Sequence, residues 1–255
     1  MSFHDAHCHL SDKFFLKDID SYFTEWRSLG LTAVISVATK LSESTKNFEL
    51  ADLYTEVIPG VGLHPWKAKR QPDHETMNVY KELLLSQRTL VIGEVGLDYH
   101  FIKNEDLYHF QEEWFCFFLS EAEKHSLPLN IHAKGAEQRV SELLDTFSLK
   151  PHKVLLHWYS GSERSLMKLN DQGYFFSVNP SLLTGSTHKR VLEFVPLEHL
   201  LTESDGNVSY TISGEKFVGS PSLIPVVIKE MSNMLNLPVE TLQNQLETNL
   251  QRYLN

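Results

Sequence analysis

The sequence predicts a parallel α/β fold, a (β/α)8 TIM barrel in which residues 1–255 form a single domain. Eight short runs rich in Val, Ile and Leu alternate with stretches of helical periodicity, the pattern of a parallel sheet covered by helices. Eight units in 255 residues give roughly 32 residues each, the size of one barrel unit. Five of the runs also end at residues that can bind metal ions.

The expected strands are short, and several are apolar on both faces, as buried parallel strands are. They cover residues 3–7, 31–38, 57–63, 89–95, 128–132, 153–157, 174–178 and 200–203. The clearest helix covers residues 106–125, where apolar positions recur at helical spacing opposite a charged face. Further helices are expected at residues 137–147, 164–171, 222–235 and 239–254.

A doubly wound open sheet is the alternative architecture. Such a sheet gathers side chains only from the few strands at its switch point. The candidate site residues follow the first, fourth, fifth, sixth and eighth strands. A closed barrel brings all these strand ends to one rim, so we expect the barrel.

The balance of acidic and basic residues indicates which kinds of partner to expect. The chain has 23 basic and 33 acidic residues, a net charge of −10, which argues against broad non-specific binding of nucleic acid. Two bound divalent ions would weaken this argument, because they add about four positive charges at the site. The two cysteines, Cys8 and Cys116, make no disulfide framework. With no signal peptide and no run of about 18 apolar residues, we expect a cytoplasmic protein without a membrane partner.

Two histidines and a carboxylate lead the list of candidate metal ligands. His7 and His9 end the first strand, and residues two apart in a strand point to the same side, so Cys8 points away. Glu94 lies inside an apolar, glycine-flanked run, where a carboxylate is costly unless it is paired or binds metal. Its two oxygens suit it to bridge two ions. Satisfied strand-end histidines and a buried ion pair are the alternatives.

The remaining candidate ligands end later runs. His132 and His157 follow apolar residues at equivalent positions of two neighbouring strands, and Asp205 follows the last strand. We expect Glu94 and Asp205 to be the catalytic carboxylates, with Asp205 as the base that takes a proton from water. His64 and Lys134 follow the third and fifth strands. Substrate contacts are one interpretation of these two, and packing or solvation is the other. Residues 160–162 form either a phosphate-binding turn or a helix cap.

At this point the sequence resembles the TatD family of metal-dependent deoxyribonucleases, within the amidohydrolase-like barrels. The matching segments follow the family order over nearly the whole chain: Asp5-Ala6-His7-Cys8-His9-Leu10, Gly62-Leu63-His64-Pro65, Ile92-Gly93-Glu94-Val95-Gly96-Leu97-Asp98-Tyr99, Ile131-His132, His157-Trp158-Tyr159-Ser160-Gly161, Glu203-Ser204-Asp205 and Asn249-Leu250-Gln251-Arg252.

The resemblance implies a barrel that holds at least two divalent ions, with Mg, Mn or Zn as candidates. It places one ion on four residues, His7, His9, Glu94 and Asp205. It places the second on Glu94, His132 and His157, with His64 and Glu203 near the substrate or behind the ligands. The family's activity is hydrolysis of DNA phosphodiesters, often from a 3′ end of a single strand.

Several loops depart from the family pattern. Lys134 stands where Arg is common, Trp158 and Tyr159 replace a small residue and Phe, and residues 206–211 lack the usual Ala and Pro. The presumed ligands are intact, so the departures concern substrate choice. They would suit a specialised member with protein partners in a multi-protein system, such as one that defends bacteria against phage.

Three functions remain in view. The first is a two-metal nuclease on single-stranded DNA, with rim aromatics that stack on bases, namely Trp66, Tyr99, Trp158 and Tyr159. The second is a metal-dependent hydrolase of a small amide, lactone or ester, which the acidic charge favours. The third is a binding or scaffold subunit, against which the complete ligand set argues. An oligonucleotide assay separates the first two, and metal analysis tests the third.

Overall fold

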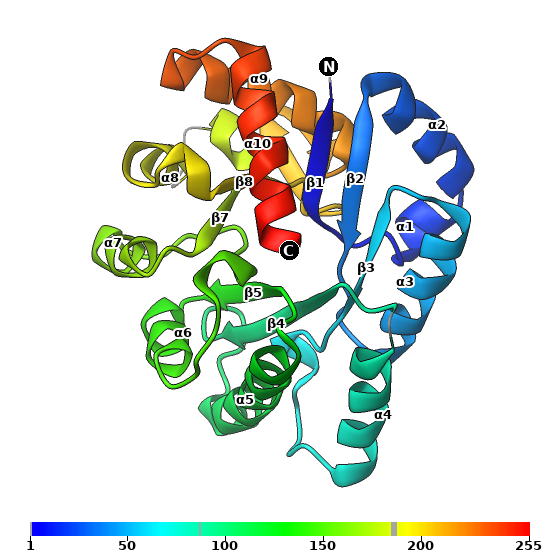
Figure 1. The fold of residues 1–255 in the computed structure, drawn as a ribbon, viewed down its shortest axis with the longest axis vertical. Coiled ribbons are helices and arrows are strands. Elements are labelled where there is room, and N and C mark those ends of the chain that lie inside the picture. Colours follow the sequence, from blue (N-terminus) through cyan, green and yellow to red (C-terminus); the bar gives the residue numbers. More distant parts are fainter. Residues whose placement is uncertain (1, 87, 185–187) are drawn as a thin grey trace.

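The computed structural model describes residues 2–86, 88–184 and 188–255. Eight parallel strands form one sheet in sequence order, with helices outside it (Figure 1). The strands are β1 (Phe3–Cys8), β2 (Leu31–Ser36), β3 (Val57–Val61), β4 (Val91–Asp98), β5 (Leu129–Lys134), β6 (Val154–Leu156), β7 (Phe175–Val178) and β8 (Leu200–Thr202). The eight predicted runs are therefore confirmed as strands, with β4 and β5 extending further towards their carboxyl ends than expected.

The last strand meets the first through hydrogen bonds at and beyond its end. The Thr202 hydroxyl donates to the His4 carbonyl over 2.9 Å. Beyond β8, the Asp205 N–H donates to the His7 carbonyl over 3.0 Å, and the His9 N–H donates to the Gly206 carbonyl over 2.8 Å. These contacts make a nearly closed barrel, so the predicted TIM-barrel class is confirmed and the open-sheet alternative is wrong.

The helices alternate with the strands, as the periodicity predicts. They are α1 (Lys13–Leu16), α2 (Ile19–Leu29), α3 (Leu41–Leu53), α4 (His74–Leu85), α5 (Tyr108–His125), α6 (Glu137–Leu144), α7 (Glu163–Asp171), α8 (His188–Phe194), α9 (Ile224–Leu235) and α10 (Val239–Leu254). The helix α10 has the predicted bounds. The helix α6 ends earlier than predicted, because Thr146 and Phe147 donate to the carbonyls of Leu143 and Leu144 and tighten the chain into a turn.

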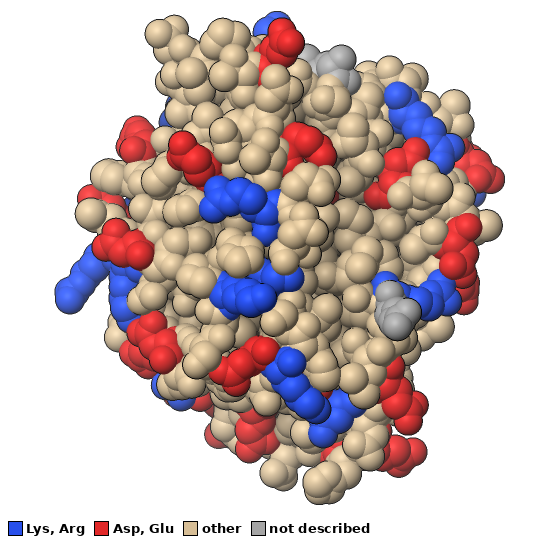
Figure 2. Space-filling view, in the orientation of Figure 1, with Lys and Arg blue, Asp and Glu red and all other residues tan. Residues whose placement is uncertain are grey.

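The helix α10 covers the end of the barrel at which the strands begin (Figure 1). Its Asn249 side chain donates to the carbonyls of Leu197 and Leu200, just before and at the start of β8. Leu250 and Tyr253 complete an apolar cluster with Val37, just beyond β2, and with side chains from six strands, namely Ala6, Ile35, Val91, Leu155, Phe175 and Leu201. Acidic and basic residues are interspersed on this face (Figure 2). The opposite end, where the strands finish, is left for the polar residues.

A hairpin after the last barrel strand was not predicted. Its strands β9 (Ser209–Ile212) and β10 (Glu215–Val218) pair antiparallel. Ser213 and Gly214 connect them with φ values of 52° and 86°, the positive values that a tight two-residue hairpin turn requires. The Tyr210 hydroxyl donates to the Ser204 carbonyl over 2.9 Å and ties the hairpin to the chain beside Asp205.

Within the described residues, no helix combines the length and apolar character that crossing a bilayer requires.

Candidate metal centre

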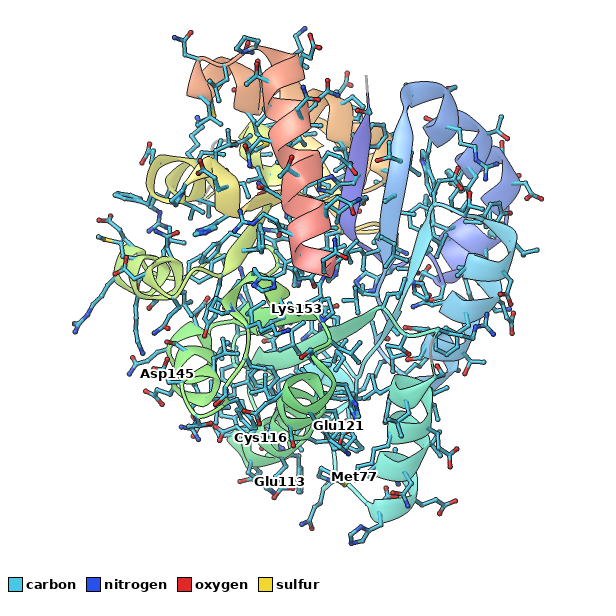
Figure 3. The ribbon with its side chains drawn as sticks, in the orientation of Figure 1. Met77, Glu113, Cys116, Glu121, Asp145 and Lys153 are labelled. Carbon is cyan, nitrogen blue, oxygen red and sulfur yellow. The ribbon has the colours of Figure 1, made fainter. Side chains whose placement is uncertain are left out.

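The six predicted ligands converge at the carboxyl ends of the strands. They are His7, His9, Glu94, His132, His157 and Asp205, and all but His7 line a cavity of about 560 Å³. His7 lies beneath them, fully buried. Neither cysteine joins them: Cys8 is buried outside the cavity lining, and Cys116 lies on α5 in the outer helical layer (Figure 3).

Four donor atoms form a compact first set. His7 Nε2 and His9 Nε2 are 3.3 Å apart. Glu94 Oε2 lies 3.6 Å from the His7 nitrogen and 3.4 Å from the His9 nitrogen. Asp205 Oδ1 lies 3.6 Å and 3.5 Å from the same two atoms. An ion with bonds of about 2.0–2.2 Å has tetrahedral ligands about 3.3–3.6 Å apart. The five separations above fall in this range, so the pair of histidines fits such an ion together with Glu94, and likewise together with Asp205.

The other oxygen of Glu94 faces a second set. Glu94 Oε1 lies 2.8 Å from His132 Nδ1 and 3.0 Å from His157 Nε2, and these two nitrogens are 3.4 Å apart. His64 Nε2 lies 3.2 Å from the same oxygen. The sequence placed His64 near the substrate or behind the ligands. Its Nδ1 accepts the Trp66 backbone N–H over 3.1 Å, so the Nε2–H donates to Glu94 and His64 supports that carboxylate beside the donor set. One buried carboxylate thus presents an oxygen to each of two donor clusters.

Two polar side chains lie within hydrogen-bond distance of the imidazoles from behind, and a third, Glu203, lies slightly farther away. The Asn130 amide donates to the Ala6 carbonyl, which turns its oxygen towards His7 Nδ1 at 2.8 Å. His7 must therefore donate from Nδ1, and its Nε2 lone pair faces the donor set. Asp98 lies 3.1 Å from His132 Nε2, and Glu203 lies 3.6 Å from His157 Nδ1. The sequence reading included Glu203 but missed Asn130 and Asp98.

The signal for the two missed residues is present in the strand pattern. Asn130 is a polar residue inside the apolar run of β5, as unusual there as Glu94 is in β4. Asp98 is four residues from Glu94 on the same strand, and positions an even number apart in a strand face the same way. Strand alternation would have identified Asp98 if β4 had been extended by three residues, and it would have identified Asn130 within the predicted strand, two residues before His132.

Charge complementarity explains why so many ionisable groups are buried together. Burial opposes ionisation of Glu94, but the surrounding His64, His157 and His7 outweigh it and hold the pKa of Glu94 well below its usual value. Burial likewise opposes protonation of His157, yet Glu94 and Glu203 raise its pKa well above the usual value. Buried charges are tolerated because each has an opposite partner or can bind a cation.

The backbone at the strand ends is shaped to bring the ligands close. Gly96 has a φ of 140°, and a Cβ on it would meet the His132 carbonyl oxygen at 2.0 Å. Only glycine therefore lets β4 approach β5 at this point. Asp205 has a φ of 44° and Trp158 a φ of 37°. Such left-handed residues after a strand concentrate at functional sites, where the turn aims the side chain.

Of the residues expected to contact substrate, some line the cavity and others do not. Lys134 lines the cavity, and its ammonium donates to the Ser160 hydroxyl over 2.8 Å. Trp66 and Trp158 also line the cavity. The expectation of rim aromatics was wrong for Tyr159, which is buried, and for Tyr99, whose ring stacks on Tyr108 outside the cavity lining.

The segment 160–162 serves in part as a helix cap. Ser162 precedes α7, and its hydroxyl accepts the N–H of Ser165 over 3.2 Å. The helix-cap alternative is therefore confirmed for Ser162. The Ser160 hydroxyl accepts a hydrogen bond from Lys134, and this contact fixes the Lys134 ammonium at the cavity wall.

Comparison with known proteins gives a consistent result. A family model described as TatD related DNase matches residues 4–255. An uncharacterized metal-dependent hydrolase of Methanocaldococcus jannaschii is 31% identical over 248 residues, covering 96% of this chain and 94% of that protein. The human deoxyribonuclease TATDN3 is 28% identical, covering 95% and 93%. The crystal structure of YjjV, a TatD homologue of Escherichia coli, superposes with a TM-score of 0.88 at 22% identity, covering 99% and 98%.

Proposed function

The chain belongs to the TatD-related DNase family, and from this premise we propose that it is a metal-dependent hydrolase that cleaves phosphodiester bonds of DNA. One observation carries the proposal beyond family membership: Glu94 presents its two oxygens to two separate donor sets. A deoxyribonuclease name among the relatives supports DNA as the substrate. Because the family match spans residues 4–255, we propose that the whole chain acts as one catalytic domain.

We propose that the two donor sets hold two divalent ions. His7, His9, Glu94 and Asp205 would hold the first, and Glu94, His132 and His157 the second, with His64 beside it. When bound, such ions would polarise the scissile phosphoryl group and lower the pKa of a water molecule. Four imidazoles favour Mn or Zn over Mg, which prefers oxygen ligands.

Asp205 is the proposed base. Its carboxylate lines the cavity within 3.6 Å of His7 and His9. Burial opposes its ionisation, but the hydrogen bond from His9 and the neighbouring imidazoles of His7 and His157 outweigh it and lower the pKa of Asp205. An ionised carboxylate at the cavity wall can accept the proton that the attacking water loses. Asp98, 3.1 Å from His132, would hold that imidazole in place, and the charge of Glu203 lies 3.6 Å from His157.

We propose that the substrate is a single strand cleaved from an end. The donor atoms lie inside a recess of about 560 Å³, which an unpaired strand end can enter while a second strand would meet the rim. Lys134 lies on the cavity wall, where its ammonium can pair with a backbone phosphate. A role in a multi-protein system is a narrower proposal, supported by the exposed apolar residues Phe217 and Val218 on the hairpin.

An oligonucleotide assay tests the proposal. Purified chain is incubated with single-stranded DNA labelled at the 5′ or the 3′ end, with Mg²⁺, Mn²⁺ or Zn²⁺ added separately. We expect stepwise shortening of one labelled form with at least one metal, and none with a chelator. A small amide or ester is the second candidate, which the net charge of −10 favours. Intact DNA under all metals, with turnover of p-nitrophenyl esters, would support it instead.

A further inference from the structure

Two exposed aromatic residues lie on the rim of the cavity. Trp66 is 43% exposed and Phe101 is 58% exposed. Among the large apolar side chains found exposed in the described ranges, these two line the cavity. Their rings contact each other edge to face, with centroids 5.5 Å apart. An aromatic pair that is left open to solvent beside a polar cavity offers a surface on which another flat ring can stack.

The aromatic pair is held rigidly from below. The Trp66 indole N–H donates to Asp98 Oδ2 over 2.6 Å. The Phe101 backbone N–H donates to the other oxygen of the same carboxylate over 2.7 Å. The His64 ring meets the Trp66 ring edge to face, with centroids 4.9 Å apart. Because the Trp66 indole and the backbone that carries Phe101 are both fixed, this surface loses less conformational entropy when a ligand binds than a mobile loop would.

Only one side chain separates the aromatic pair from the candidate metal ligands. Asp98 Oδ2, which accepts from Trp66, lies 3.1 Å from His132 Nε2. His64, which contacts Trp66, lies 3.2 Å from Glu94 Oε1. Lys67 follows Trp66 in the chain and lines the same cavity. A phosphate at the donor atoms would therefore place its own nucleotide next to this wall, with a lysine ammonium nearby.

We propose that Trp66 and Phe101 form a stacking subsite for the unpaired base adjacent to the scissile phosphate, with Lys67 facing the next phosphate of the strand. The inference rests on the proposed function, because it takes the ligand to be DNA. Both faces of a base inside a duplex are covered by neighbouring bases, so the subsite binds only unstacked nucleotides. Stacking tolerates every base, because each has a flat face. The subsite thus distinguishes unpaired from paired strands without distinguishing one base from another.

The first test compares substrates with and without the base. The variants are Phe101→Ala, Phe101→Tyr and, as a matched control on α8, Phe194→Ala, whose ring is 38% exposed away from the cavity. Each is assayed on a single-stranded oligonucleotide and on the same strand with abasic residues at its end. We expect Phe101→Ala to raise KM for the normal strand roughly 5- to 150-fold, the value of one stacking contact. On the abasic strand the difference should vanish, and Phe101→Tyr should restore binding.

The second test needs no turnover. An oligonucleotide with 2-aminopurine at its end is titrated with the chain in the presence of chelator, and fluorescence quenching reports stacking on an aromatic ring. Quenching by the wild type and by Phe194→Ala, but not by Phe101→Ala, supports the subsite. Equal quenching by wild type and Phe101→Ala overturns it, as does an equal KM increase on normal and abasic strands. Failure of the wild type to cleave any strand overturns the proposed function alone, because quenching is read without cleavage.

Discussion

The carboxylate of Asp98 lies 3.1 Å from Nε2 of His132. The other nitrogen of this imidazole, Nδ1, lies 2.8 Å from Glu94 Oε1. Each ring nitrogen of His132 thus faces a carboxylate oxygen. With a cation in the site, the Nε2–H would donate to Asp98 and the Nδ1 lone pair would face the cation. We therefore expect Asp98 to be a positioning residue, which decides which nitrogen of His132 is free to bind a cation.

The substitution Asp98→Asn tests this role. The new amide can still contact Trp66 and His132, but it carries no charge and can present a donor where an acceptor is needed. We expect metal affinity and kcat to fall about 10- to 100-fold, with the native circular dichroism spectrum retained. Metal titration and kinetics measure this. Asp73→Asn, at the cap of α4, serves as the control and should leave metal affinity unchanged. Unchanged affinity in Asp98→Asn would rule out the positioning role.

Gly96 is expected to be intolerant of any side chain. A Cβ at this position would lie 2.0 Å from the His132 carbonyl oxygen, and the φ of 140° is itself unfavourable for other residues. We expect Gly96→Ala to lower the free energy of unfolding by about 3 kcal/mol or more. Gly214→Ala is the matched control, because its φ is 86° but no atom lies within 4 Å of the added carbon. It should cost about 1 kcal/mol. Urea denaturation compares the two, and equal losses would contradict the clash.

His4 should make the fold sensitive to acid. It is buried, and burial lowers the pKa of His4 from 6.5 to about 4. The unfolded chain therefore takes up a proton on this residue below pH 6.5, whereas the folded chain does so only near pH 4. The stabilising contribution is complete above pH 6.5 and is lost as pH falls towards 4, by up to about 3 kcal/mol.

The variant His4→Leu isolates that effect. The difference in unfolding free energy between wild type and variant should shift by about 3 kcal/mol between pH 7 and pH 4, in favour of the variant at low pH. Urea denaturation at several pH values measures it. A difference that stays constant over this range would show that His4 is not held neutral in the folded chain.

Lys134 is expected to bind substrate phosphate. Its ammonium is fixed against Ser160 at the cavity wall. We expect Lys134→Ala to raise KM for single-stranded DNA about 10-fold and to reduce the salt dependence of binding by about one phosphate contact. Lys134→Arg should keep most of the affinity, and Lys229→Ala on α9 should change neither quantity. If the salt dependence of DNA binding were unchanged in Lys134→Ala, the role of this lysine would be packing alone.

The parts of the fold that the sequence predicted are those governed by local pattern. Apolar runs that end in His132, His157 or Asp205 indicate both the strand and the rim at which it finishes. In a barrel all parallel strands finish at one end, so residues nearly two hundred positions apart could be predicted to meet. The hairpin of β9 and β10 was missed, because its short alternation follows a stretch that resembles a loop.

The orientation of individual side chains was less predictable. Tyr99 and Tyr159 follow strand ends, as Trp66 and Trp158 do, yet only the tryptophans line the cavity. Which way each points depends on contacts with α5 and the neighbouring loops, such as the hydrogen bond from Tyr99 to Glu112 on α5. Such contact partners are remote in the sequence, or their positions depend on the conformation of the loops. The position of His64 at Glu94 Oε1 likewise depends on how β3 is placed against β4.

The most direct test of the account is the metal content and DNA cleavage of Glu94→Gln. Glu94 supplies one oxygen to each donor set, so an uncharged amide there should empty both. We expect about two ions per wild-type chain and cleavage of single-stranded DNA, and in Glu94→Gln less than about one ion and at least a thousandfold slower cleavage. Glu113→Gln on the exposed side of α5 (Figure 3) should match the wild type. A folded Glu94→Gln variant that keeps two ions and cleaves DNA at the wild-type rate would contradict the account.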